Sequence, residues 1–509
     1  MLSKLKTLGL MGMNGYAIDV EVDISNGLPA FDIVGLPDAA VKESKERVRA
    51  AIKNSDYTFP AKRLTVNLAP ADIRKEGPSF DLGIAVGILQ ATGQLPVEGD
   101  ALDEALVMGE LSLDGAVRPI RGVLPMLATK AYPRVYIPDE NKEEAAHVPD
   151  ISIYPVRTLK ELALSLSGES PIPAYHRSIP IEDRELDKYQ VDFSEVKGQE
   201  SVKRAMEIAA AGGHNILMIG PPGSGKTMLA RRLPTILPKL SYREALESTM
   251  IYSAAGALPE NTGILVERPY RSPHHTVSSV ALVGGGRIPK PGEISLAHHG
   301  VLFLDELPEF KKDVLEMLRQ PLEDGTITIS RVHGSGTFPA EFMLVASMNP
   351  CPCGYYGDAT RQCTCTPLRI TQYLSRISGP LLDRIDIQVP AQAIPFDKLQ
   401  QTKPSESSVT IRKRVEAART IQYKRYEKIG LYRNAQLTGK LLSEYCELPG
   451  DAQALLKHAF DRLGLSARAY DRILKVARTI ADLEGKEMIE TGHVAEAVQY
   501  RSLDRQYWA

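Results

Sequence analysis

Gly220-Pro221-Pro222-Gly223-Ser224-Gly225-Lys226-Thr227 is the stretch that decides the fold, and the apolar run Ile216–Ile219 directly precedes it. It fits the phosphate-loop pattern G-x-x-x-x-G-K-[ST], with a predicted strand before it and a predicted helix, Met228–Leu233, after it. Glycines let backbone N–H groups close around phosphate oxygens, and the helix N-terminus adds the positive end of its dipole. Lys226 is expected to reach the β- and γ-phosphates and Thr227 to ligate Mg²⁺. The stretch therefore predicts an α/β fold that binds ATP with Mg²⁺.

A second signal lies downstream, where the short apolar run Val301–Leu304 ends in Asp305-Glu306. A buried parallel strand presents its carboxylates at the edge where α/β sheets bind ligands. Asp305 is expected to hold the Mg²⁺ through water, and Glu306 to act as general base on the attacking water. A helix-like stretch, Lys311–Arg319, follows. The pattern favours hydrolysis of the nucleotide as well as binding.

The composition is that of an ordinary soluble protein of about three domains, because 509 residues exceed what one core usually holds. A net charge of −2 excludes a global positive field, so any binding of nucleic acid needs local patches. No apolar stretch reaches membrane-spanning length. The run Met1–Met13 is broken by glycine and is too short for a signal peptide. We expect a cytoplasmic protein without a membrane partner.

The chain divides into four parts. Residues 1–166 alternate strand-like segments (17–22 and 63–68) with helix-like segments (38–53 and 80–91). Residues 167–191 are polar and contain prolines, which is typical of a linker. Residues 192–395 form a second α/β unit, and from 396 to 509 strand signals give way to three or four amphipathic helices.

Two further polar residues are candidates for the catalytic centre. Asn349 follows the apolar strand Phe342–Ser347, where its amide could orient water and sense the γ-phosphate, or simply cap a turn before Pro350. Arg384, in the run Leu381-Leu382-Asp383-Arg384-Ile385-Asp386, is either a surface ion-pair partner or an arginine finger for a neighbouring subunit's nucleotide. The spacing alone does not choose between these interpretations.

These motifs together resemble an AAA+ ATPase of the magnesium-chelatase-like branch, and within it the bacterial YifB/ComM family. The resemblance covers essentially the whole chain and includes Pro291–Gly300 before the acidic strand and the adenine-side motif Val196–Gln199. It implies an AAA+ core, a parallel sheet flanked by helices, over 192–395 and an α-helical lid over 396–509.

The resemblance also assigns roles and partners. Asn349 would be sensor 1, Arg384 the arginine finger acting in trans, and Arg468 the sensor 2 residue of the lid. The family assembles as hexameric rings, so a homo-oligomer is expected. It implies a branch-migration helicase on single-stranded or branched DNA during transformation. A protein-remodelling motor of the metal-chelatase type is the alternative.

Two insertions separate this branch from plainer AAA+ proteins. One is the glycine- and proline-rich loop Val283–Gly292, and the other is a predicted hairpin with strands 327–331 and 336–338. In related DNA motors such loops line the pore of the ring. The candidate DNA contacts are Arg287, Lys290, Arg331 and His333. Each of them could equally be an ordinary exposed loop charge.

Four of the five cysteines form a paired pattern, Cys351-Pro352-Cys353 and Cys363-Thr364-Cys365, separated by nine residues. Four thiolates at one point can close a tetrahedral Zn²⁺ site and stiffen a loop that has little core. Free thiols and an iron–sulfur ligand set are the alternatives. We favour structural zinc.

The N-terminal part resembles a Lon-protease-like (ribosomal S5 domain 2-like) domain, of the ChlI type, through Lys75–Ser79 and Gly109–Gly115. Ser79 aligns with the nucleophile of a Ser–Lys pair. Leu124 takes the place of the lysine, and a leucine cannot accept a proton. The domain is therefore expected to be catalytically inactive, with Ser79 in a turn or at a helix start.

A basic stretch with interleaved tyrosines lies between Ile411 and Arg433. It is either a nucleic-acid footprint or a solvated helix face near a subunit interface.

Overall fold

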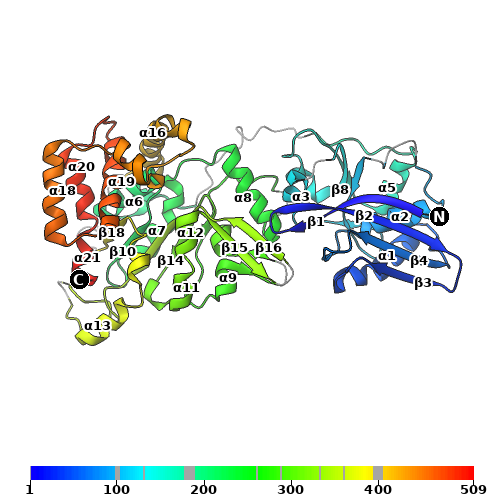
Figure 1. Ribbon diagram of the computed structural model, residues 1–509, viewed down its shortest axis with the longest axis horizontal. Helices are drawn as coiled ribbons and strands as arrows, with labels where there is room; N and C mark the ends of the chain where they lie inside the picture. The colour runs from blue at the N-terminus through cyan, green and yellow to red at the C-terminus, as the bar shows by residue number, and fades with distance from the viewer. Residues whose placement is uncertain are drawn as a thin grey trace.

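The computed structural model describes residues 2–97, 102, 104–129, 132–176, 190–259, 262–286, 289–331, 334–358, 361–393 and 405–508. Figure 1 shows an elongated chain with an N-terminal sheet at one end, a second sheet in the middle and a group of helices at the other end. Among the described residues no helix is both long and apolar enough to cross a membrane.

The N-terminal sheet has seven strands in the order β3-β4-β2-β1-β5-β8-β9. Its strands are β1 (Leu2–Met11), β2 (Asn14–Ser25), β3 (Ala30–Val34), β4 (Arg63–Ala69), β5 (Ala105–Val107), β8 (Arg134–Pro138) and β9 (Ser152–Val156). A two-stranded ribbon, β6 (Glu110–Leu111) with β7 (Val117–Arg118), lies beside it. The helices are α1 (Ala39–Asn54), α2 (Asp81–Ala91), α3 (Val123–Thr129), α4 (Lys142–Ala145) and α5 (Leu159–Leu166).

The strand β1 was not predicted from the sequence. It lies in the interior of the sheet, antiparallel to β2 and parallel to β5. Because successive side chains of a strand point to opposite faces, Leu5 packs into the core with α1 and α2, while Leu8 packs into the core with α3. The first half of β1 alternates exposed and buried side chains, but the run Thr7–Gly9 is buried on both faces and lacks the polar alternation that identifies a half-buried strand.

The middle sheet has five parallel strands in the order β11-β14-β17-β10-β18. They are β10 (Ile216–Ile219), β11 (Tyr270–Arg271), β14 (Val301–Leu304), β17 (Met343–Met348) and β18 (Ile387–Pro390). Met218 packs on one face with α6 (Glu200–Gly212), and Ile219 packs on the other. All carboxyl ends of these strands meet at one edge. The predictions of a buried strand at 216–219 and another at 301–304 are confirmed.

Shorter elements surround this sheet. The helices are α7 (Lys226–Arg232), α8 (Tyr242–Ala255), α9 (Ser279–Val283), α10 (Glu293–Leu296), α11 (Lys312–Glu316), α12 (Arg319–Asp324), α13 (Pro367–Leu374) and α14 (Gly379–Leu382). The predicted helix 311–319 is interrupted at Met317–Leu318 and continues as α12. The insertions form two hairpins: β12 (Gly284–Gly285) with β13 (Lys290–Pro291), and β15 (Thr326–Arg331) with β16 (Gly334–Pro339).

The C-terminal part is helical, as the sequence predicts, but it is divided more finely. Its helices are α16 (Ser408–Tyr426), α17 (Gly439–Tyr445), α18 (Gly450–Leu463), α19 (Ala467–Leu483), α20 (Thr491–Gln499) and α21 (Ser502–Trp508). Left-handed glycines follow two of them, with φ of 62° at Gly464 and 67° at Gly485. Such residues end helices readily, which contributes to the finer division: the described residues of this part form six helices where three or four were expected.

The N-terminal and middle parts are joined through α8. The amide of Gly122, just before α3, donates to the carbonyl of Ser253 (3.1 Å). The Ser253 hydroxyl donates to the buried carboxylate of Glu144 (2.7 Å). Leu246 and Met250 of α8 pack against the core around α3. One face of α8 is thus part of the N-terminal packing.

Candidate active site

The phosphate loop joins β10 to α7 at the carboxyl edge of the middle sheet. Its turn needs glycine, because Gly223 and Gly225 have φ of 78° and 87°, values that side chains disfavour. Gly220 has no room for a side chain, since a Cβ there would lie 1.9 Å from the carbonyl oxygen of Ala391. These conformations are typical of a loop that wraps its backbone N–H groups around a phosphate at the start of a helix.

Lys226 lies buried within this loop. Its ammonium donates to two loop carbonyls, at 2.8 and 2.9 Å, and to Oδ1 of Asn349 at 3.2 Å. Burial lowers the pKa of Lys226, while the carboxylates of Asp305 and Glu306 oppose this shift. The two loop carbonyls and the Asn349 amide oxygen that accept from Lys226 are neutral. A bound phosphate would place a negative charge beside the ammonium. The fold thus brings together Lys226 and Asn349, residues 123 positions apart.

The oxygen atoms suited to Mg²⁺ meet at the end of β14. The hydroxyl of Thr227 donates to Oδ2 of Asp305 at 2.6 Å, and the hydroxyl of Ser347 donates to Oδ1 of the same carboxylate. A hydroxyl and a carboxylate are hard oxygen donors, which Mg²⁺ prefers. Ser347 was missed in the sequence, although a serine in an apolar strand two residues before Asn349 points to the same sheet edge.

Glu306 is next to this pair and half exposed. It has a left-handed backbone, with φ of 55°, and a non-glycine residue in that region is strained. Its Oε2 lies 3.7 Å from Nδ1 of His275. His275 was not singled out from the sequence, because only the fold brings the end of β11 beside the end of β14.

Gln199 occupies the adenine-side motif and touches the phosphate loop. Its side-chain amide donates to the carbonyl of Ser224 (2.8 Å) and to the carbonyl of Gln392 after β18 (2.6 Å). Gln199 itself has a left-handed backbone, with φ of 60°. The motif therefore connects the entry of α6 with the loop, which is compatible with a position beside the nucleotide.

Arg384 and Arg468 are not part of this site. Both line a cavity of about 390 Å³ whose wall includes residues that precede strands, such as Asn215 before β10 and Asp386 before β18. The cavity therefore lies at the amino edge of the parallel sheet, whereas the phosphate loop lies at the carboxyl edge. The four residues of β10 alone separate the two edges by about 13 Å.

Within the cavity the two arginines have different contacts. Arg384 is held by an ion pair with Glu323 and by two backbone carbonyls, at 2.7 and 3.1 Å. Arg468 is exposed and reaches Oδ2 of Asp383 at 3.2 Å. In this arrangement neither lies near the phosphate loop of its own chain.

The two insertion hairpins pack against each other. A Cβ at Gly284 would lie 2.8 Å from Ile329, and one at Gly285 would lie 3.4 Å from the guanidinium of Arg331. Lys290 and Arg331 are both exposed on these hairpins. Arg287 and His333 lie outside the described residues. The two described cations therefore belong to one surface.

The sequence stretch with many basic residues is largely structural. Arg414 pairs with Glu207 and Glu406, Arg425 with Asp482, and Arg433 with Glu341. Arg419 is half-buried, and its pKa is lowered to about 9 by burial and nearby arginines. These contacts favour a helix that packs on α6 and α19 over a nucleic-acid footprint.

Ser79, which aligns with the nucleophile of a Ser–Lys pair, lies in a turn, as predicted. Ser79 precedes α2, and its carbonyl accepts from the amide of Gly109 at 2.9 Å. Leu124 is fully buried in α3. Lys75 is also buried, and its ammonium donates to the carbonyls of Pro70 and Ile73. The buried lysine therefore fixes its own loop.

The four clustered cysteines come together, as the pattern predicts. One sulfur from each of Cys351, Cys353, Cys363 and Cys365 lies within 4.8 Å of all the others. Cys446 is separate and buried in the helical part.

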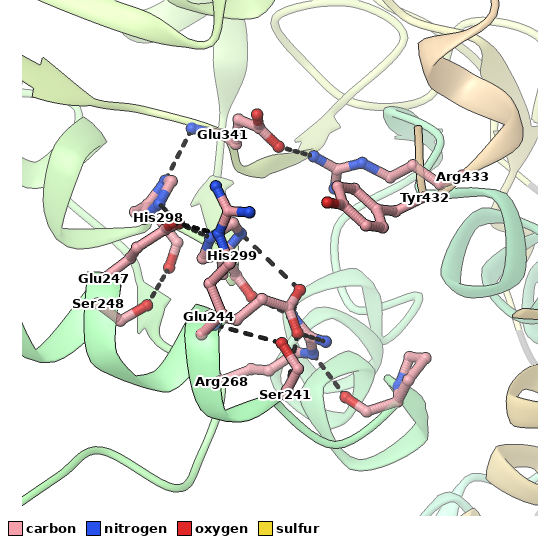
Figure 2. Close-up of polar contacts among 12 residues, drawn as sticks. Ser241, Glu244, Glu247, Ser248, Arg268, His298, His299, Glu341, Tyr432 and Arg433 are labelled. Carbon is pink, nitrogen blue, oxygen red and sulfur yellow. Dashed lines mark hydrogen bonds and ion pairs between the residues drawn. The ribbon is translucent and has the colours of Figure 1, made fainter. Parts of the chain in front are cut away.

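A second cluster of possible metal ligands lies at the amino edge of the sheet, where Glu247 of α8 meets His298 and His299 (Figure 2). Nδ1 of His298 accepts the backbone N–H of Glu341 at 3.0 Å, so the neutral ring carries its proton on Nε2. A ring whose Nε2 bears a proton cannot ligate a metal through that atom, and metal-bound histidines donate rather than accept at the other nitrogen. The cluster is therefore a hydrogen-bond network and not a metal site.

A glycine-rich phosphate loop, a Thr–Asp pair suited to Mg²⁺ and a neighbouring glutamate at one edge of a parallel sheet define the class of P-loop nucleotide-binding proteins. Comparison with known families narrows this class. The family described as magnesium chelatase, subunit ChlI, matches residues 192–399, that described as subunit ChlI of Mg-chelatase matches residues 20–141, and the ChlI C-terminal family matches residues 405–501.

Full-length relatives give the particular family. The chain is 46% identical over 508 residues to YifB of Salmonella typhimurium, covering 99% of this chain and 98% of that one. It is 45% identical over 499 residues to competence protein ComM of Haemophilus influenzae, covering 97% and 96%. Similarity to the magnesium-chelatase 38 kDa subunit of Cereibacter sphaeroides is 29% and covers 31% of this chain and 52% of that one. The chain belongs to the YifB/ComM family of magnesium-chelatase-like AAA+ proteins, and this membership suggests ATPase activity.

Proposed function

We propose that the protein is an ATP-hydrolysing ring motor that moves branched or single-stranded DNA. The observation that carries the catalytic part is the convergence of Lys226, Thr227, Asp305 and Asn349 at one sheet edge. Lys226 and the loop amides bind the phosphates, Thr227 and Asp305 hold Mg²⁺, and Glu306 activates water. Asn349 orients the attacking water and senses the γ-phosphate.

The position of the two arginines supports a ring. Because Arg384 and Arg468 face the amino edge of the sheet, they can serve only a nucleotide bound by another subunit. A hexamer places the carboxyl edge of one subunit against the amino edge of the next, so that each active site is completed in trans. An arginine supplied in this way stabilises charge in the transition state.

DNA is the proposed substrate because the exposed cations Lys290 and Arg331 share one surface formed by two packed hairpins. If the subunits hydrolyse ATP one after another around the ring, this surface would move along the phosphate backbone of the DNA. The similarity to competence protein ComM of Haemophilus influenzae supports a role in branch migration during transformation or recombination. The N-terminal part (1–166) and the linker (167–191) are proposed to be a non-catalytic domain attached to the AAA+ core (192–395) and lid (396–509).

A remodelling motor for a protein partner, of the metal-chelatase type, is the second candidate, supported by the partial similarity to a chelatase subunit. Steady-state ATP turnover, measured with and without a four-way DNA junction over a range of salt concentrations, separates the two. We expect stimulation by DNA that declines as salt rises and that is absent in Glu306→Gln. Turnover that is indifferent to every DNA tested would contradict the DNA motor.

A further inference from the structure

The cysteine cluster has the dimensions of a metal–thiolate site. The sulfur atoms of Cys351, Cys353 and Cys363 are separated by 3.3, 3.7 and 3.6 Å. Four sulfurs placed tetrahedrally about 2.3 Å from Zn²⁺ are about 3.8 Å apart. The separations are far longer than the roughly 2.05 Å of a disulfide, and all these cysteines are free.

Backbone donors surround the sulfurs. The amide of Cys365 donates to the sulfur of Cys363 (3.4 Å), and the amides of Thr364 and Tyr355 donate to the sulfur of Cys353. Amide donors of this kind can also support sulfur atoms that ligate a metal. The described residues between Asn349 and Thr366 contain no helix or strand, so the segment lacks other regular structure to hold it.

This segment lies directly against the nucleotide site. Cys351 is fully buried two residues after Asn349, whose Oδ1 accepts from Lys226. Gly354, with φ of 86°, approaches Pro222 so closely that a Cβ would lie 2.5 Å from the proline ring. The cluster therefore touches the site on two sides, at the sensor residue and at the phosphate loop.

We propose that Cys351, Cys353, Cys363 and Cys365 bind one Zn²⁺ and that this ion holds Asn349 and the phosphate loop in the arrangement that binds nucleotide. The inference rests on the proposed ATP binding. Without the ion the four cysteines of this segment are no longer tied to one another through a metal. Pro222 and Asn349 then lose the support of Gly354 and Cys351. Nucleotide affinity therefore depends on a metal that takes no part in the reaction.

The test uses the full chain and two independent measurements, metal content by mass spectrometry and affinity for a fluorescent ATP analogue. The wild type is expected to carry one zinc per chain. Removal of zinc with a strong chelator is expected to weaken binding of the analogue by about tenfold or more. This is the effect of losing one hydrogen bond to a charged group. Added zinc restores the affinity, which shows that the stripped protein is not misfolded.

Variants separate metal binding from its coupling to the nucleotide site. Cys363→Ser is expected to lose zinc and affinity together, whereas the matched control Cys446→Ser keeps both. Gly354→Ala is expected to lose affinity, because its Cβ would meet Pro222 and its φ of 86° disfavours a side chain, while the four zinc ligands stay in place and zinc is retained. Protein purified without zinc, or with iron instead, overturns the assignment of the metal. Zinc-free protein with unchanged affinity overturns the coupling. If the wild type carries zinc but binds no ATP, the proposed function fails and the coupling fails with it, while the zinc assignment stands.

Discussion

Nδ1 of His275 lies 3.7 Å from Oε2 of Glu306, the glutamate expected to activate water. The imidazole ring also meets Phe310 edge-on, with ring centroids 6.4 Å apart. His275 lies four residues before α9, which leads directly into the β12–β13 hairpin. If DNA moves that hairpin, as proposed, the movement would reach Glu306 over a short length of chain.

The first prediction concerns this contact. His275→Ala is expected to raise ATP turnover without DNA by up to about fivefold, because a partly exposed polar pair contributes about 0.2–1 kcal/mol. The same variant is expected to show less stimulation by DNA. His274→Ala, which changes the adjacent ring, is the control. The expected rise assumes that His275 restrains Glu306 away from its productive position. A fall in basal turnover in His275→Ala would show instead that the histidine holds Glu306 in its productive position.

A second prediction follows from the two edges of the sheet. Arg384→Ala is expected to lower kcat about a thousandfold or more, since an arginine finger acts on the transition state. When Arg384→Ala and Glu306→Gln chains are mixed, rings with some intact sites should form, because each variant supplies what its neighbour lacks. Arg376→Ala, an exposed arginine paired with Glu309, should change little. Mixtures no more active than their components would argue against a site shared between subunits.

The hairpin cations provide a third prediction. Lys290→Ala and Arg331→Ala are each expected to weaken binding of single-stranded DNA and to reduce the slope of log affinity against log salt by about 0.7, the value for one lost phosphate contact. Fluorescence anisotropy over a salt series measures both quantities. Lys457→Ala, which removes an exposed lysine of α18, should leave the slope unchanged. An equal slope in all four proteins would remove these hairpins from the DNA path.

The fourth prediction concerns acid stability. Burial alone would raise the pKa of Glu244, but Arg268 and the amide of Ser241 outweigh it and lower this pKa from 4.5 to about 2 (Figure 2). Because the folded pKa is the lower one, the stabilisation is present above the ordinary carboxylate pKa and is lost as the pH falls from about 4.5 toward 2. A shift of this size corresponds to at most about 3 kcal/mol.

Glu244→Gln is therefore expected to be less stable than the wild type at pH 7 and to lose less of its stability between pH 5 and pH 3. Urea unfolding followed at several pH values measures this difference. The exposed Glu444 provides the control substitution Glu444→Gln. Parallel pH profiles for wild type and Glu244→Gln would show that the ion pair with Arg268 contributes nothing to folding.

Local patterns predicted the nucleotide-binding elements well. The phosphate loop with its strand, and the acidic strand end, are each a short continuous stretch of sequence. A local motif is therefore enough to identify each of them. The hydrogen bond between Lys226 and Asn349 was not itself predicted, although parallel strands bring their carboxyl ends to one edge. The cysteines met as their spacing predicted.

Features that depend on distant segments could not be predicted. The contact between His275 and Glu306, and the network of Glu247 with His298 and His299, join residues of different elements whose neighbours are set only by the strand order. The basic stretch was ambiguous for the same reason. Its arginines reach acidic partners as far away as Glu207 and Asp482, which no local pattern reveals.

The most direct test of the central claim is real-time branch migration of a synthetic four-way DNA junction carrying a fluorophore and a quencher on separate arms. We expect the wild type to separate the arms with ATP and Mg²⁺. We also expect no separation with a non-hydrolysable analogue, with Glu306→Gln or with Arg384→Ala. Separation that proceeds without hydrolysis, or its absence in wild-type protein that hydrolyses ATP on the same junction, would contradict an ATP-driven DNA motor.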